Sequence, residues 1–182
     1  MLVQRNVNDT AVIGTTVARW QDLRTRWWAA RGRQLHPWHA SPMYRSFLAD
    51  LLERLLPIGL ARVTELEMAE RVVAVEISLM DSRRLYAWTD GYDPAYASLG
   101  LGKLGVAEGV RWSIETGREL YDFMVGDESY KYQFGAQDRY CDWIMLGTDR
   151  PRSRLAGVAS AAREASLGLT ALPGVHGSAA ST

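Results

Sequence analysis

The sequence predicts an α+β domain with a mostly antiparallel sheet, and three observations lead to this fold class. Two segments with the helical spacing of apolar residues come first, at 16–28 and 42–56. Apolar and polar residues then alternate over 65–88, interrupted by two short turns, which is typical of three antiparallel strands. A helix at 103–116 and a strand at 119–124 follow a glycine-rich loop. Helices grouped before and after a run of neighbouring strands are typical of an α+β fold.

The size and composition of the chain limit what it can be. Its 182 residues suffice for one domain with a sizeable core. Lys+Arg and Asp+Glu balance at 21 each, so the overall charge gives no reason to expect nucleic acid or a membrane as partner. One cysteine excludes an internal disulfide framework and suits a reducing compartment. No secretory leader or membrane-spanning apolar run is recognisable, so we expect a soluble, cytoplasmic protein.

The chain divides by pattern into four parts. Residues 1–15 carry little pattern beyond a short candidate strand and are expected to form an N-terminal arm. The main domain follows at 16–149. Residues 150–172 predict an alanine-rich C-terminal helix, and the small polar residues of 173–182 predict a disordered tail.

The first helix combines tryptophans with arginines. Arginines between tryptophans can form a surface on which bases stack. A tryptophan stripe that faces the core, with a solvated arginine face opposite, agrees better with the neutral overall charge. The residues concerned are Val17, Trp20, Trp27 and Trp28, with Arg19, Arg24 and Arg26 between them.

Two histidines and one cysteine are the remaining candidates for metal or thiol chemistry. His36 and His39 have HxxH spacing, but Pro37 disfavours a helix that would hold both imidazoles on one face. No further His or Cys lies nearby, so we expect two loop histidines and no metal. Cys141 lies in an alternating segment and is expected to be a packed core residue.

The stretch 83–134 is expected to hold the functional site. It reads as a strand at 85–89, a loop at 90–102, the helix at 103–116, a second strand and an acidic turn leading to Tyr130. Where the loop meets the helix, unpaired backbone N–H groups and the positive end of the helix dipole favour an anion, most often a phosphate.

This junction contains a literal G-x-G-x-x-G, formed by Gly100, Gly102 and Gly105, with Asp122 about twenty residues further on. These features would fit a dinucleotide-binding site. However, a ten-residue loop separates the motif from its strand, and that strand ends an antiparallel meander, whereas the dinucleotide unit opens a parallel sheet. The motif is therefore weak evidence for a nicotinamide or flavin cofactor.

A second set of residues gives a closer match to a known family. These residues are Tyr86-Ala-Trp88, Gly91-Tyr-Asp-Pro94, Tyr96-Ala97, Gly102, Tyr121-Asp-Phe123, Gly126-Asp-Glu128, Tyr130-Lys131 and Phe134-Gly135. Together with the order of elements, they resemble the GNAT acyltransferase superfamily over about 19–146, and most closely the acetyltransferase domain of CelD-like proteins, which are related to Fem-type aminoacyltransferases. The resemblance implies a GNAT-like twisted, mixed, mostly antiparallel sheet with helices on both faces.

The resemblance also implies a co-substrate and the residues that bind it. The loop before the third helix of a GNAT enzyme binds the pyrophosphate of acyl-CoA, here expected to be acetyl-CoA. This chain departs from the branch, because Gly100-Leu101 replaces Ser-Pro and Ser98 replaces a basic residue. Binding would then depend mostly on backbone N–H groups. The expected cofactor-binding residues are Gly100, Leu101, Gly102, Lys103, Leu104 and Lys131.

For the chemistry, the resemblance assigns proton transfer to the start of the last helix. Tyr130 matches the tyrosine that protonates the departing thiolate. Asp127, Glu128 or Glu76 would accept the proton of the amine, directly or through water. Asp127 and Glu128 could equally serve as charges at a helix N-terminus, and Tyr130 with Lys131 could stabilise a turn.

The function expected from all of this is N-acylation, with a small-molecule or peptide amine as acceptor and no membrane partner. Two alternatives stay open. A Fem-like enzyme would take an aminoacyl group from tRNA and use the arginine-rich helix as an RNA surface. A non-catalytic half-domain would bind a partner or form a homodimer.

Overall fold

Five strands of one sheet and five α-helices make up the part of the chain that the structure, a computed structural model, describes, namely residues 2–139. The chain divides into two units, residues 1–137 and 138–182, and the fold below is that of the first. Two 3-10 helices, η1 and η2, complete it. The elements are β1 (Leu2–Asn6), η1 (Thr10–Val12), α1 (Ile13–Ala29), α2 (Pro37–Ala40), α3 (Pro42–Leu55), β2 (Ala61–Met68), β3 (Arg71–Met80), β4 (Arg84–Tyr92), η2 (Pro94–Leu99), α4 (Leu101–Glu115), β5 (Leu120–Asp122) and α5 (Ser129–Gln133).

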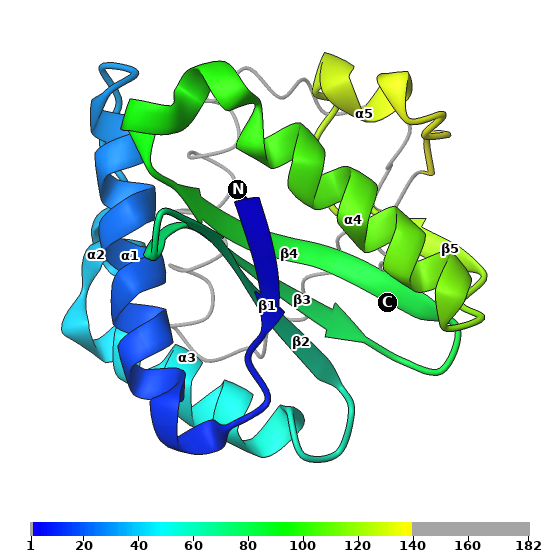
Figure 1. The fold of residues 1–182 in the computed structure, drawn as a ribbon, viewed down its shortest axis with the longest axis horizontal. Coiled ribbons are helices and arrows are strands. Elements are labelled where there is room, and N and C mark those ends of the chain that lie inside the picture. The colour runs from blue at the N-terminus through cyan, green and yellow to red at the C-terminus, as the bar shows by residue number, and fades with distance from the viewer. Residues whose placement is uncertain (1, 140–182) are drawn as a thin grey trace, which may run out of the picture. The chain divides into compact units, whose positions relative to one another are not determined.

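The strands lie in the order in which they occur in the sequence, β1-β2-β3-β4-β5 (Figure 1). The first three pairs are antiparallel, and β4 pairs with β5 in parallel. The turn between β2 and β3 consists of Ala69 and Glu70, both at positive φ, as a tight two-residue hairpin requires. The predicted α+β fold, with a mixed and mostly antiparallel sheet, is confirmed.

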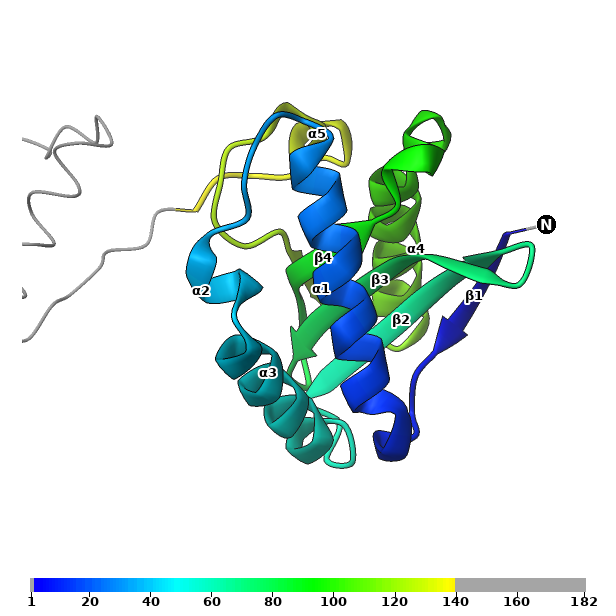
Figure 2. The ribbon, with the colours of Figure 1, turned by 90° about the vertical axis from the view of Figure 1, so that its left-hand side faces the viewer.

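Helices cover both faces of this sheet. Figure 2 shows α1 and α3 on one side and α4 on the other. The larger core cluster lies on the α1 and α3 side, where Trp20 and Leu48 pack against Val75. The α4 side is more polar, because Glu76 and Asp90 occupy it at paired positions of β3 and β4.

The start of α3 is as the sequence predicts. The Ser41 hydroxyl accepts a hydrogen bond from the Tyr44 N–H at 3.1 Å, and Pro42 occupies the first helical position. An N-cap serine followed by proline satisfies a free N–H and fixes a helical φ, which explains why the helix begins here.

Two tryptophans of α1, Trp20 and Trp27, pack against the core, whereas Trp28 lies beside Arg24 and Arg33. Other arginines of α1 are paired with carboxylates. Trp20 is buried, whereas Arg19 bonds Glu65 and Arg26 bonds Asp22 at 2.9 Å. The expectation of a simply solvated arginine face was therefore incomplete, since acidic residues from the sheet and from α1 itself engage it.

The predicted loop 90–102 contains more regular structure than expected. β4 continues to Tyr92 because Gly91 and Tyr92 still pair with β3. Asp93 then caps η2, with its side chain accepting from the Ala95 N–H at 3.1 Å. α4 accordingly begins at Leu101, two residues before the predicted start. The short candidate strand near the N-terminus is β1, at the edge of the sheet.

Several predictions concern residues outside the described range. These are the strand that contains Cys141, the C-terminal helix at 150–172 and the tail at 173–182. They stay predictions.

Gly91 allows the backbone of α1 to approach β4, and replacing it should weaken this packing. A Cβ at Gly91 would lie 2.7 Å from the Trp20 carbonyl oxygen, a backbone atom that cannot move aside cheaply. We expect Gly91→Ala to lower the free energy of unfolding by about 1–3 kcal/mol, as overpacking does. Urea denaturation measures this change. Gly14→Ala on α1 is the matched control, since a Cβ there meets nothing within 4 Å; an equal loss in both variants would contradict the close approach.

Candidate functional site

The start of α4 is the junction at which the sequence places an anion. Gly100 takes the left-handed conformation, with φ 63° and ψ 39°, and no side chain caps the helix there. The N–H groups of Lys103 and Leu104 already donate to the Gly100 carbonyl oxygen, at 2.9 and 3.1 Å. The N–H groups of Lys103 and Leu104 are therefore engaged within the helix. Of the four amides expected to bind phosphate, those of Leu101 and Gly102, the first two of the helix, can still donate to a ligand.

Three glycines of α4 face the sheet and bring the helix close to it. A Cβ at Gly102 would lie 3.3 Å from the Tyr92 hydroxyl, and one at Gly105 would overlap the Glu76 carboxylate. At Gly109 it would lie 2.7 Å from the ring of Tyr121. The glycine pattern therefore leaves room for side chains of the sheet, and this accounts for the second and third glycines of the G-x-G-x-x-G without a dinucleotide.

Glu76 and Asp90 form a carboxylate pair beneath this helix, since they occupy directly opposite positions on β3 and β4. The pKa of the Glu76 carboxyl is raised to about 8, first by burial and then by the charge of Asp90. Burial likewise raises the pKa of Asp90, whereas the charge of Arg24 opposes this rise. Two facing carboxyls with raised pKa values can take up and release a proton near neutral pH.

Asp90 is also held from the other side of the sheet. Arg24 of α1 donates to the Asp90 carbonyl oxygen at 2.6 Å and to its carboxylate at 3.1 Å. The Asp90 side chain keeps 44% of its surface open to solvent despite its raised pKa. A carboxylate that is anchored, partly desolvated and still accessible is suited to accept a proton.

Tyr130 of α5 interacts electrostatically with Asp90. It is half-buried, and its ring lies 6.4 Å from that of Phe123, measured between ring centroids. Its pKa is raised by burial, then by the negative charges of Asp90 and Glu128. A tyrosine with a raised pKa stays protonated and can donate its proton to a stronger base.

The other residues expected at the start of α5 have different environments. The Lys131 side chain is buried, donates to the carbonyl oxygens of Val125 and Gly126 at 3.1 Å, and pairs with Glu128 at 2.7 Å. Lys131 therefore holds the turn before α5, as the structural interpretation of this residue predicts. The hydrogen bond from Lys131 lowers the pKa of Glu128, which makes Glu128 a weaker base. Asp127 is exposed.

Lys103 bridges the two candidate binding elements. Its ammonium group donates to the Gln133 side chain at 2.8 Å and so connects the first turn of α4 with the end of α5. The structure thus brings Gly100, Leu101, Gly102 and Lys103 together at one helix start.

Beyond Tyr86, the edge of β4 that faces β5 is open. β4 and β5 pair at only three positions, Arg84, Leu85 and Tyr86 with Leu120 to Asp122, and β4 then continues to Tyr92. Among residues 2–139, no strand covers this remaining edge. Unpaired N–H and C=O groups of a strand edge can bind an extended ligand that carries amides.

The histidine pair shows no metal site. His36 caps the short helix α2, with its Nδ1 accepting from the Trp38 N–H at 3.2 Å, and its ring lies 5.9 Å from that of His39. Within residues 2–139, no group of three His, Cys, Asp or Glu side chains is arranged to hold a metal ion. No helix of this range is long and apolar enough to cross a bilayer.

Comparison with known proteins agrees with this fold. The model of the acetyltransferase (GNAT) domain family matches residues 5–132, and the chain belongs to this family. No curated protein matches the sequence.

Among solved structures, a predicted acetyltransferase with acetyl-CoA from Clostridium acetobutylicum is similar, with TM-score 0.60, 14% identity and coverage of 81% of this chain and 96% of that chain. A GCN5-related N-acetyltransferase from Ralstonia eutropha has TM-score 0.58, 11% identity and coverage of 80% and 98%. An aminoglycoside acetyltransferase from an uncultured soil metagenomic sample, in complex with sisomicin, has TM-score 0.52, 15% identity and coverage of 81% and 97%. At such identities, the likeness establishes the fold.

Sequence reasoning missed Asp90, which it assigned to a loop, whereas it named Glu76 among the candidate proton acceptors. The signal for Glu76 is that it interrupts the apolar run from Val72 to Ile77. Asp90 could have been found by continuing the strand to Tyr92, which places Asp90 opposite Glu76.

The raised pKa of Glu76 predicts a stability that depends on pH. Between pH about 4.5 and about 8, the native state keeps a proton that the unfolded chain releases, so stability falls as pH rises through this window. We expect Glu76→Gln to be more stable than the wild type at about pH 9, by an amount on the order of a few kcal/mol, with little difference near pH 4. Urea denaturation at both pH values measures this. Glu53→Gln, at an exposed position of α3, is the control, and parallel curves for Glu76→Gln and the wild type would contradict the raised pKa.

Proposed function

We propose that this chain is an N-acyltransferase that moves an acyl group, most simply acetyl, from acyl-CoA to an amine. The observation that carries the proposal is the position of Asp90, which pairs across the strands with Glu76 and interacts with Tyr130, next to the open edge of β4. A proton acceptor and a proton donor thereby lie within electrostatic range of each other, and acyl transfer to an amine requires both groups.

The donor would lie along β4 and at the start of α4. Its diphosphate would accept hydrogen bonds from the N–H groups of Leu101 and Gly102, and Lys103 would supply a nearby positive charge. Its extended arm contains amides that match the open edge of β4 beyond Tyr86. The similar structure with acetyl-CoA supports this choice of donor.

The chemical step needs positioning and proton transfer. The ammonium of the acceptor first releases one proton to water. The free amine nitrogen then attacks the thioester carbonyl, the C–S bond breaks, and the thiolate takes the Tyr130 proton while the second amine proton passes to Asp90, directly or through water. Burial raises the pKa of Asp90 and so makes its carboxylate a stronger base, whereas Glu76, with a pKa of about 8, keeps its proton at neutral pH. Asp127 and Glu128, the bases expected from the sequence, become secondary candidates.

The acceptor would be a cationic amine in solution, attracted by the carboxylate pair. The similar acetyltransferase in complex with sisomicin supports a small-molecule amine over a peptide.

Three further expectations stay proposals. A cytoplasmic location would follow from the use of acyl-CoA. The proposed kinship with CelD-like and Fem-type proteins rests on the Gly126-Asp-Glu128 and Tyr130-Lys131 motif. A homodimer also stays a prediction, which sedimentation of the full chain would test.

Calorimetric titration of the full chain with acetyl-CoA tests the donor. We expect saturable binding with a Kd on the order of micromolar. Free adenosine should bind much more weakly, because it lacks the diphosphate and the amide-containing arm. Absence of binding would favour the non-catalytic half-domain instead.

Paired substitutions test the proton donor and acceptor. Tyr130→Phe and Asp90→Asn should each lower kcat by on the order of 100-fold, since each removes one proton-transfer group, while acetyl-CoA affinity changes little. The matched controls are Tyr132→Phe on the same helix and the exposed Asp127→Asn, and both should keep kcat within about twofold of the wild type. A large loss in Asp127→Asn with normal Asp90→Asn would transfer the role of base to Asp127.

A further inference from the structure

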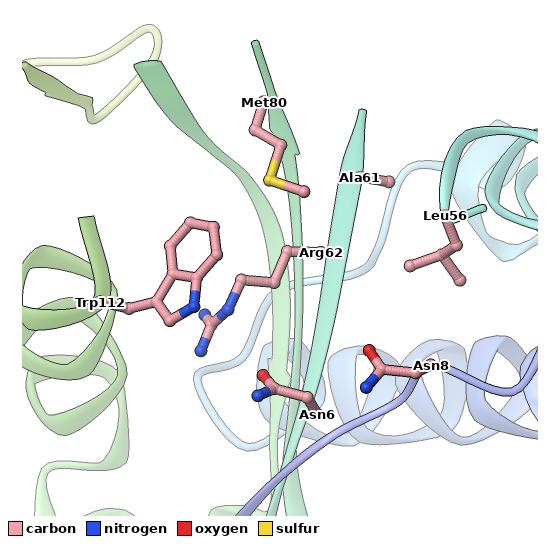
Figure 3. Close-up of a pocket in the computed structure, with 7 residues that line it drawn as sticks. All are labelled: Asn6, Asn8, Leu56, Ala61, Arg62, Met80 and Trp112. Atoms are coloured by element: carbon pink, nitrogen blue, oxygen red, sulfur yellow. The ribbon is translucent and has the colours of Figure 1, made fainter. Parts of the chain in front are cut away.

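A cavity of about 300 Å³ lies at the end of the sheet away from the glycine junction (Figure 3). β1 and β2 pair only as far as Asn6 and Thr64, so the first residues of β2, Ala61 and Arg62, lie beyond the last pair. Trp112, near the C-terminus of α4, forms part of the wall. It follows Leu101 by eleven residues, which corresponds to about 16 Å along the helix. The cavity is therefore separate from the glycine junction, although Arg62 in its wall interacts electrostatically with Glu76.

Arg62 places a buried positive charge in the wall of this cavity. Only 8% of the residue is exposed, and its Nε atom has no hydrogen-bond partner. The carbon at the centre of its guanidinium lies 4.7 Å from the centroid of the Trp112 ring, and that of Arg118 lies 4.2 Å from the same centroid. Burial lowers the pKa of Arg62, and the negative charge of Glu76 opposes this effect most, ahead of that of Glu108.

The hydrogen-bonded link between this charge and a carboxylate is indirect. In the orientation of the Gln4 amide that satisfies both neighbours, its oxygen accepts from Arg62 Nη2 at 2.9 Å and its nitrogen donates to Glu108 Oε2 at 3.0 Å. One amide thus separates the guanidinium from a carboxylate. A buried charge normally has a direct counter-ion, so this arginine can gain much from an anion in the cavity.

The rest of the wall indicates what kind of anion would fit. Asn6 and Asn8 add amide groups that can donate hydrogen bonds, and in Figure 3 the Asn6 side chain points toward the guanidinium. Met80, Leu56 and Ala61 form an apolar boundary. One end of a ligand would therefore meet donors and a cation, and the other end would meet hydrocarbon, which is typical of small-molecule sites.

We propose that this cavity is a binding site for a small organic carboxylate, whose anionic end contacts Arg62 and Asn6 and whose apolar body packs against Met80 and Leu56. The site does not depend on the acyl transfer proposed above. It would make the protein responsive to a metabolite that is neither donor nor acceptor.

Calorimetric titration of the full chain with benzoate tests the site, and benzamide serves as the neutral probe of the same shape. We expect benzoate to bind with a Kd on the order of 1 mM or tighter and benzamide at least tenfold more weakly, because only the carboxylate can pair with the guanidinium. In NMR spectra, the indole N–H signal of Trp112 and the side-chain amide signals of Asn6 and Asn8 should move during the benzoate titration.

Two variants locate the binding. Arg62→Met removes the charge at similar length and should abolish benzoate binding, whereas Arg54→Met, at an exposed position close to Leu56, should leave it unchanged. If Arg62→Met does not fold, Asn6→Asp replaces it, because Asn6 is exposed and the substitution keeps the shape of the side chain. Its carboxylate should occupy the place of the ligand, raise the melting temperature and weaken benzoate binding at least tenfold.

Three results would overturn the proposal. The first is the absence of saturable benzoate binding up to about 50 times the expected Kd. The second is equal affinity for benzoate and benzamide. The third is benzoate binding that Arg54→Met weakens as much as Arg62→Met or Asn6→Asp does, which would indicate only general attraction to a positive surface.

Discussion

The close approach of α4 to the sheet is the constraint on which the rest of the site depends. Gly102, Gly105 and Gly109 remove the side chains that would otherwise separate the helix from β3, β4 and β5. The space is taken by long polar side chains of the sheet, such as Glu76, instead of by small apolar ones. An ordinary helix would exclude a glutamate from this layer, so the glycines and the buried carboxylate require each other.

This arrangement gives the sheet two faces of different chemistry. The face under α1 and α3 is a continuous apolar core, which provides most of the burial. The face under α4 carries carboxylates between two arginines, since Arg24 reaches Asp90 at one end and Arg62 lies toward the other. Gly91 lets the backbone of α1 lie against β4, so that Arg24 can reach Asp90 from the opposite side of the sheet. Charged residues on the polar face can therefore set the pKa values of Glu76 and Asp90, while the apolar face maintains the fold.

The fold could be read from the sequence because its signals are local. Alternation over β2 and β3, the Ser41 cap and the spacing of α3 each occupy a few consecutive residues. The site could be read only in part, because the pairing of Glu76 with Asp90 depends on the register between two strands, and Arg24 joins them from a helix 66 residues away. For Lys131 the sequence left two roles open, binding the co-substrate or stabilising a turn, and its burial and its bonds to the turn carbonyls favour the second.

The glycines of α4 divide into two groups with different physical tasks. Gly100 is the left-handed residue that ends η2, and it has no side chain to cap α4. The first amides of α4 are therefore left available to an anionic ligand. Gly102, Gly105 and Gly109 instead determine how near the helix lies to the sheet, at a cost of about 1 kcal/mol each in helix propensity relative to alanine. A search for sequence motifs cannot distinguish the two roles, because glycine performs both. In the folded chain they are separated by the direction each residue faces, so affinity for a phosphate and the basicity of the carboxylate pair can vary independently.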